Sequence, residues 1–294
     1  MSCKTKYQNT GKSRCQLDWL LIKKVIAIPY GTEFNGSNID DWIMAGIHNA
    51  DPAKRFYPMP DFTGIEDNST DGTTYTSGYG IETLLTKPLV GFTQTYTPDV
   101  CLQNRLVSGF DDNLVRSFLI VDSGNRIWGV KTTTGMKGFT GKMTPRASGA
   151  TMADSIAEPT IAYRFTVAGE MENKWYAQGD LTAEDYDGLL DVSMNVTTES
   201  SNLLITFSAD GCGDDDVTAE MLGLDGVAAC WLVGDDSNGY AAIGTAPTYD
   251  STKGAFKVAA STVASGKTLK LAAPNVLYTN NVTNKECVNS YTAA

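Results

Sequence analysis

The run Arg116–Lys131 (RSFLIVDSGNRIWGVK) constrains the fold more than any other part of the sequence. Two segments rich in β-branched and aromatic residues flank the tetrapeptide Asp122-Ser123-Gly124-Asn125, whose glycine is able to take a positive φ. The run therefore predicts a β-hairpin. Alternating apolar and polar residues predict further strands at Leu20–Pro29, Leu84–Tyr96 and Thr160–Val167. The expected fold class is mainly β, of sandwich or barrel type, with long loops and a short helix.

Short helices are expected at residues 38–48 and from Thr182 to Leu190, where Thr182 suits the N-cap and Glu184 and Asp185 follow in the first turn. Asn38 suits the N-cap position, and Asp40 and Asp41 would lie in the first turn, where the helix dipole favours negative charge. The following stretch, Asp51–Gly80, is rich in proline and in small polar residues, and it is interpreted as a loop.

Three regions are expected along the chain. Residues 1–19 are polar and basic and are interpreted as an N-terminal arm. Residues 20–196 carry the strand patterns described above, and the polar run Asn195–Asn202 is interpreted as a domain boundary. Residues 203–294 contain short strand candidates at the spacing of a small β-sandwich. These candidates are Leu203–Phe207, Val227–Val233, Tyr240–Ile243, Ala255–Val258, Leu269–Leu271 and Val276–Tyr278.

Composition argues against several classes of function. The chain has 294 residues, with 23 Lys and Arg against 34 Asp and Glu, which gives a formal net charge of −11. An acidic chain is a poor binder of nucleic acid, because phosphate binding requires clustered cations. The single histidine, His48, is incompatible with a multi-histidine metal site. None of the six cysteines forms a CxxC pair, so no zinc site is expected and the thiols are interpreted as buried and free.

No motif indicates catalysis. The sequence has no G-x-S-x-G nucleophile motif and no phosphate-binding loop. The acidic turns at Asp214–Asp216 and Asp235–Asn238 do not follow the spacing of a calcium-binding EF-hand loop. His48 is placed at a helix end, where a histidine favours the negative pole of the dipole. We therefore expect no enzymatic activity, no catalytic residue, no metal and no cofactor.

The N-terminus lacks the apolar stretch of a signal peptide. The apolar runs fall short of the ~20 residues that span a membrane. These features predict a soluble protein that is made in the cytoplasm and has no membrane partner.

Two segments are expected to contact other subunits. The stretch Thr132–Pro159 has no strong core pattern, and a loop of that length in a compact domain is usually functional or packed against a partner. The basic N-terminal arm would dock on an acidic neighbour of the same kind. The residues proposed for these inter-subunit contacts are Lys4, Lys12, Arg14, Met136, Lys137, Phe139 and Met143.

This order of elements resembles that of bacteriophage tail tube (major tail) proteins. The resemblance is one of pattern over residues 20–195: an early strand, a long loop, the hairpin Phe118–Val130, the Gly/Thr-rich segment Gly135–Pro159, the strand Thr160–Val167 and a short helix. The remainder, Leu203–Ala294, resembles the immunoglobulin-like domains that many tail tube proteins carry.

The resemblance implies a homo-oligomer in the virion tail, assembled in the host cytoplasm together with other tail proteins. Subunits would form a ring, usually a hexamer, and stacked rings would form the tube through which DNA passes without specific binding. A closed ring removes free sheet edges. Long arms would reach the neighbouring ring, which would account for Thr132–Pro159 and Asp51–Gly80. Acidic residues, not lysines, are expected on the strands that face the lumen.

Two other classes of function stay open. A capsid decoration, head-fibre or head–tail connector ring protein would use the same β domains and acidic surface. A glycan-binding or host-surface module would require an exposed aromatic cluster, for which the candidates are Trp231, Tyr240 and Tyr249.

Overall fold

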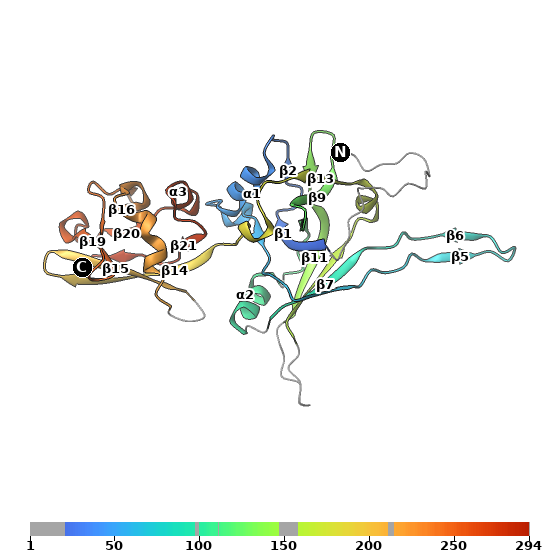
Figure 1. Cartoon of the computed structure of the whole chain (residues 1–294), viewed down its shortest axis with the longest axis horizontal. Coiled ribbons are helices and arrows are strands. Elements are labelled where there is room, and N and C mark those ends of the chain that lie inside the picture. Colours follow the sequence, from blue (N-terminus) through green and yellow to red (C-terminus); the bar gives the residue numbers. More distant parts are fainter. Residues whose placement is uncertain (1–20, 98–99, 111, 147–157, 211–214, 294) are drawn as a thin grey trace, which may run out of the picture. The chain divides into compact units, whose positions relative to one another are not determined.

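The computed structural model describes residues 21–97, 100–110, 112–146, 158–210 and 215–293 (Figure 1). The chain forms two compact units. The first comprises Met1–Ile47 and Ala53–Asp187, and the second comprises His48–Pro52 and Gly188–Ala294. Strands predominate, which confirms the expected mainly β fold. Across the described ranges, no helix has the length and apolar character needed to cross a membrane.

The first unit is built on one large sheet with the strand order β2-β10-β9-β8-β11-β12-β7-β4; β1 pairs with β8 and β3, and β13 pairs with β9. The strands are β1 (Ile22–Ile28), β2 (Glu33–Phe34), β3 (Tyr57–Pro58), β4 (Gly64–Asp67), β7 (Gly91–Thr95), β8 (Arg116–Asp122), β9 (Arg126–Lys131), β10 (Met136–Lys137), β11 (Phe139–Arg146), β12 (Thr160–Phe165) and β13 (Lys174–Gln178). A separate two-stranded ribbon joins β5 (Thr74–Thr76) to β6 (Glu82–Leu84). The strands predicted at the start of the chain, in the hairpin and at residues 160–167 are therefore present, whereas the strand expected at Leu84–Tyr96 is interrupted between Leu84 and Gly91.

The core of this unit is aromatic. Phe118 of β8 packs edge-on against Tyr163 of β12, with ring centroids 5.5 Å apart, and Phe92 of β7 lies 4.8 Å from the same tyrosine ring. Phe139 and Phe165 extend the cluster at a centroid distance of 5.6 Å. Rings in these tilted and edge-on arrangements add attraction beyond the area that they bury. The sheet is thus held by side chains from strands that are distant in sequence.

Buried tyrosines should make the first unit sensitive to alkaline pH. Burial raises the pKa of Tyr96 and Tyr163 above the ordinary value of 10.0, and burial together with a hydrogen bond to Asp40 does the same for Tyr186. In the unfolded chain these phenols ionise near pH 10, while in the folded chain they stay protonated. The unfolded state then binds fewer protons, so the free energy of unfolding should fall by about 1 kcal/mol per pH unit for each tyrosine.

Urea unfolding between about pH 9 and pH 11 measures this slope. The Tyr163→Phe variant, which has no phenol to ionise, should show a shallower slope than the wild type. Equal slopes for the two proteins would contradict the prediction.

Two α-helices belong to the first unit, α1 (Ile39–Ile47) and α2 (Val100–Phe110). The helix α1 confirms the one expected at residues 38–48, because the Asn38 side-chain oxygen accepts hydrogen bonds from the backbone nitrogens of Asp40 at 3.0 Å and Asp41 at 3.4 Å. The helix α2 has no counterpart among the elements predicted from the sequence. Short 3₁₀ turns lie at Pro52–Lys54, Ala168–Asn173, Ala183–Asp185, Thr218–Leu224, Ala228–Cys230 and Ala260–Thr262.

The interpretation of Thr132–Pro159 as an inter-subunit loop is wrong for its first half. Met136, Phe139 and Met143 are buried on β10 and β11, inside the first unit, and cannot contact another subunit. Lys137 forms an ion pair with the buried Glu170 at 2.7 Å. Strand β11 joins β8 to β12 in the middle of the sheet, and this position explains the burial. Residues 147–157 lie outside the described part of the chain.

The second unit is a β-sandwich around its own core. One sheet has the order β18-β19-β15-β14-β21 and the other the order β17-β16-β20-β22. The elements are β14 (Leu190–Glu199), β15 (Asn202–Ala209), β16 (Trp231–Asp235), β17 (Gly239–Ala242), β18 (Thr248–Asp250), β19 (Ala255–Ala259), β20 (Thr268–Leu271), α3 (Pro274–Thr279), β21 (Lys285–Cys287) and β22 (Tyr291–Thr292). Trp231 of the second sheet packs on Phe256 of the first at a centroid distance of 5.8 Å, so the two sheets share one core.

Three sequence predictions about this unit are wrong in whole or in part. The strand expected at Val227–Val233 begins only at Trp231, because Ala228–Cys230 form a 3₁₀ turn. The proposed boundary at Asn195–Asn202 is the end of a hairpin, in which β14 pairs with β15 and Ser200 takes a φ of 54° at the turn. The units divide after Asp187 instead. The strand expected at Val276–Tyr278 is part of α3, which Pro274 begins at a position where a missing N–H costs the helix nothing.

Candidate functional site

A long β-hairpin projects from the sheet of the first unit. It continues β4 and β7 beyond the sheet and carries β5 and β6 near its tip (Figure 1). We call residues 68–90 the hairpin arm. From Asp67 to Gly78, at about 3.3 Å per residue, the arm reaches roughly 35 Å. Its first strand belongs to the stretch Asp51–Gly80, for which a loop was expected. That expectation is wrong for residues 57–58, 64–67 and 74–76, which are strands.

Backbone hydrogen bonds hold the arm together along its length. Near the base, Thr70 N donates to Leu89 O at 2.8 Å and Leu89 N donates back to Thr70 O at 3.2 Å. Farther out, Leu85 N donates to Thr73 O at 2.7 Å. At the tip, Gly80 N donates to Ser77 O at 2.8 Å, and Gly80 adopts a φ of 76° that favours glycine. The arm is therefore a regular ribbon with a defined turn.

Apolar side chains are exposed on both faces of the arm. Tyr75 pairs with Thr83, so Tyr75, Ile81 and Leu85 share one face by strand alternation, while Leu84 lies on the other. All four side chains are exposed, and Tyr79 at the tip is 94% exposed. Exposed apolar side chains gathered in this way are typical of surfaces that bind a partner.

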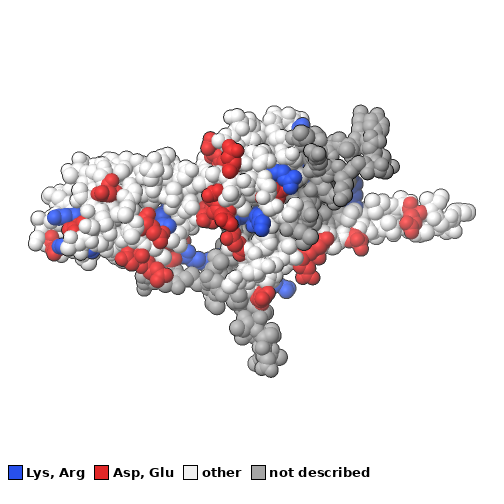
Figure 2. All heavy atoms as spheres, in the orientation of Figure 1, with Lys and Arg blue, Asp and Glu red and all other residues white. Residues whose placement is uncertain are grey.

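Within the described part of the chain, no further strand pairs with the outer edges of the β5–β6 ribbon. A two-stranded ribbon is marginally stable in water, and each of its outer edges presents unpaired N–H and C=O groups to a further strand. Few charges protect it, since residues 68–90 contain only Asp71, Glu82 and Lys87 as charged side chains. On the face drawn in Figure 2 the arm is correspondingly almost white, whereas acidic groups are scattered over the remainder of the molecule. These properties favour a protein partner for the arm.

The base of the arm is fixed by a close approach at Gly91. A Cβ atom at this position would lie 2.5 Å from the Asn68 side-chain oxygen and 2.9 Å from the Tyr163 carbonyl oxygen. The Asn68 amide nitrogen donates to Thr93 Oγ1 at 2.8 Å, across the two strands of the hairpin. The absence of a side chain at residue 91 therefore lets the arm leave the sheet at a fixed register.

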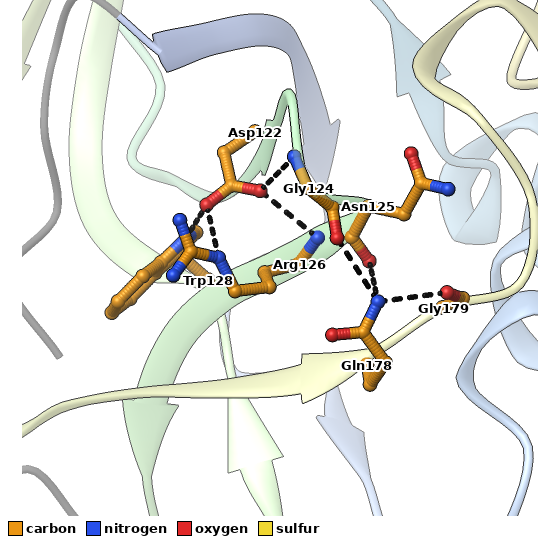
Figure 3. Close-up of polar contacts among 7 residues, drawn as sticks. All are labelled: Asp122, Gly124, Asn125, Arg126, Trp128, Gln178 and Gly179. Carbon is orange, nitrogen blue, oxygen red and sulfur yellow. Dashed lines mark hydrogen bonds and ion pairs between the residues drawn. The ribbon is translucent and has the colours of Figure 1, made fainter. Parts of the chain in front are cut away.

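The hairpin β8–β9 contains the buried carboxylate of Asp122, whose two oxygens accept four hydrogen bonds (Figure 3). It accepts hydrogen bonds from Gly124 N at 2.8 Å and Arg126 N at 3.1 Å, and from Arg126 Nε at 2.6 Å and Trp128 Nε1 at 2.8 Å. Asn125, with a φ of 56°, and not Gly124 takes the left-handed conformation in this turn. All acceptor positions of the carboxylate face protein donors, so Asp122 is a structural residue.

Strand β13 closes over the same turn. The Gln178 side-chain nitrogen donates to Gly124 O at 3.0 Å and to Gly179 O at 3.1 Å, while Gly179 N donates to Asn125 O at 2.9 Å. The turn is thus hydrogen-bonded both to the Asp122 carboxylate and to β13. These bonds make this end of the sheet that carries the arm rigid.

The surface-binding candidates do not form an exposed cluster. Trp231 is fully buried in the second unit, where its indole Nε1 donates to Leu224 O at 3.4 Å, so its proposed role in binding a glycan is wrong. Tyr249 packs on Phe256 at a centroid distance of 5.2 Å. Tyr240 lies under the Lys270 ammonium, 3.4 Å from its ring centroid, and its hydroxyl donates to Asp236 at 3.0 Å. Lys4, Lys12 and Arg14 fall outside the described residues.

Trp231→Ala is expected to destabilise the second unit, because truncation of a buried tryptophan costs about 3–5 kcal/mol. Tyr240→Ala, which removes a half-buried ring and its surface contacts to Lys270 and Asp236, should cost about 1 kcal/mol or less. Thermal unfolding followed by calorimetry measures both changes. A Trp231→Ala protein with unchanged thermal stability would contradict the assignment of Trp231 to the core.

The histidine and the described cysteines are structural. His48 is buried, stacks on Tyr278 at a centroid distance of 4.0 Å and places Nε2 at 3.1 Å from the Asn284 side-chain oxygen. Cys230 and Cys287 are free, and burial raises the pKa of both thiols, which disfavours the reactive thiolate. No group of three metal-ligating side chains occurs in the part of the chain that the structure describes.

Comparison with known proteins adds no identification: no family model matches the sequence, and no curated protein is significantly similar to it. The candidate site therefore rests on the geometry of the hairpin arm. The sequence carried a signal for it, because Thr74-Tyr75-Thr76 and Glu82-Thr83-Leu84 alternate on either side of the turn-forming run Ser77–Gly80.

Proposed function

We propose that this protein is a structural virion protein that assembles with copies of itself into stacked rings, which form a phage tail tube for the passage of DNA. The observation that carries the proposal is the hairpin arm. A ribbon that reaches roughly 35 Å from its sheet, at about 3.3 Å per residue, and exposes apolar side chains on both faces is suited to lie between neighbouring subunits.

Self-association is the form of partnership that fits the rest of the molecule best. An arm that binds a different surface of an identical subunit makes a head-to-tail contact, and such contacts close into rings or continue as filaments. The second unit has a separate core and is therefore able to sit as an appendage on such an assembly. The net charge of −11 suits a conduit whose wall does not hold DNA.

The other candidate functions have less support. A capsid decoration or connector ring protein would also use an arm, but its assemblies would not be tubes of stacked rings. A glycan-binding module would need an exposed aromatic cluster, whereas Trp231 is buried and Tyr249 packs on the core of the second unit.

Negative-stain electron microscopy of the purified full-length protein tests the proposal. We expect rings at moderate protein concentration and stacked rings or tubes at high concentration. Closed rings that never stack would favour a connector, and trimers a decoration protein. A protein that stays monomeric throughout would contradict every assembly proposed here.

A further inference from the structure

A basic hollow of about 620 Å³ lies at the base of the hairpin arm, on the sheet face opposite to the aromatic core. Three cationic side chains from two adjacent strands line it: Lys142 and Arg146 of β11, and Arg164 of β12. Leu89 and Val90 of the arm contribute an apolar wall. Hence the hollow combines positive charge with apolar surface.

Strand register places the three cations on one face. Lys142 lies directly opposite Arg164 in the β11–β12 pair, and Arg146 is two alternations farther along β11. The intervening residue Met143 and its cross-strand partner Tyr163 point into the core and are buried. The charges therefore project away from the core, into the hollow.

Among the described residues, no carboxylate pairs with these three cations. Within the described ranges, the only polar partner of these three side chains is the Asn113 amide oxygen, 3.0 Å from Lys142 Nζ. Like charges directly opposite each other on a sheet are destabilising. Such a pair in a chain with a net charge of −11 is best explained by an anionic group supplied from outside the subunit.

The tip of the arm offers a group of that kind. Glu82 is exposed on β6, pairs with Thr76 and has no cation opposite it. Leu84, two residues along, shares its face and is also exposed. One face of the arm thus presents a carboxylate beside an apolar side chain, which complements the cations and the apolar wall of the hollow.

We propose that the basic hollow receives the arm tip of a second copy, with Glu82 paired to Arg146 and Arg164 and Leu84 packed against Leu89 and Val90. This inference rests on the proposed self-assembly and names the surface on which one face of the arm docks. Arm and hollow lie at different places on the same subunit, so the contact is head-to-tail and repeats from copy to copy. If the lumen of the proposed tube is acidic, the basic hollow does not face it and is instead covered by protein.

A charge-swap experiment tests the pairing. Arg164→Glu and Glu82→Arg should each weaken self-association about 10- to 100-fold in sedimentation velocity, because each places like charges together. The double variant, Glu82→Arg with Arg164→Glu, should recover most of the wild-type association, since the pair is restored with reversed polarity. Lys257→Glu, a charge reversal at an exposed position in the second unit, is the matched control and should leave association unchanged.

Three outcomes would overturn the inference: unchanged association of both single variants, failure of the double variant to recover while its thermal stability matches the wild type, or a wild-type protein that stays monomeric at low salt. Binding of duplex DNA that is lost in Arg164→Glu would assign the hollow to nucleic acid instead. If the Arg164→Glu variant still forms tubes, the hollow is not the surface on which the arm docks, and the proposed function stands. If the oligomers respond to the charge swaps but never form rings, the hollow is the docking surface and the tail tube function is wrong.

Discussion

Removal of the apolar face of the hairpin arm is expected to abolish assembly and leave the subunit folded. In the variant that combines Tyr75→Ser, Ile81→Ser and Leu85→Ser, three side chains that share one face lose their apolar surface. Burial of such a side chain contributes about 1.5–3 kcal/mol, so their combined loss should weaken each contact between copies by more than about a thousandfold.

The same side chains are exposed in the isolated subunit, and surface substitutions usually change stability by about 0.5 kcal/mol or less. Sedimentation velocity should therefore report a monomer, and thermal unfolding should stay close to that of the wild type. Tyr30→Ser is the matched control, because Tyr30 is an exposed tyrosine of the first unit outside the arm. Normal assembly of the triple variant would show that the arm face is not the contact.

Loss of the Asp122 carboxylate is the second change with a large expected effect. Asp122→Ala leaves the Trp128 indole N–H and two backbone N–H groups without their acceptor, and it leaves Arg126 without its ion-pair partner. The Asp122 side chain is 1% exposed, so water does not easily replace these bonds. Removal of one partner from a buried charged pair costs about 3–5 kcal/mol, and we expect a loss of that size in the free energy of unfolding.

Asp112 provides a matched control in the same unit. It too pairs with an arginine four residues later, Arg116, and its side chain is 33% exposed. An exposed pair contributes about 1 kcal/mol or less, so Asp112→Ala should cost much less than Asp122→Ala. Urea unfolding of the two variants measures both values. Equal losses would show that burial of the carboxylate is not what makes the Asp122 network strong.

The parts of the fold that were predicted correctly depend on local signals. The hairpin β8–β9 was predicted from its turn and its β-branched flanks, and the helix α1 from its N-cap at Asn38. Both are decided by residues close together in sequence, so the sequence alone is enough to predict them.

The strand β11 was missed because glycines obscured its pattern. A Cβ atom on Gly138 would lie 2.7 Å from Phe118 N, and one on Gly141 would lie 2.6 Å from the Arg164 carbonyl oxygen. These glycines allow the close approach of β8 and β12 to β11, which is a property of tertiary packing. In the sequence they look like the glycines of a loop, and this is why the pattern around Met136, Phe139 and Met143 wrongly predicts an inter-subunit arm.

The true arm was missed for a related reason. Its Thr-rich strands have no buried face, and the alternation of apolar and polar residues that marks a half-buried strand is weak there. The basic hollow was not predicted either, because its cations come from strands whose pairing places Lys142 opposite Arg164, 22 residues later in the chain. Pairing between distant strands is set by the whole sheet and leaves no mark in the local sequence.

A photocrosslinker at the tip of the arm tests the central claim most directly. Tyr79 is 94% exposed, and its replacement by the aromatic crosslinking residue p-benzoylphenylalanine should leave the fold unchanged. After irradiation of the assembled protein we expect covalent dimers and higher ladders, with the crosslinked peptide coming from a second copy. The same residue at Tyr30 should give few crosslinks between copies. Covalent products confined to single chains, at concentrations where the protein associates, would contradict the account.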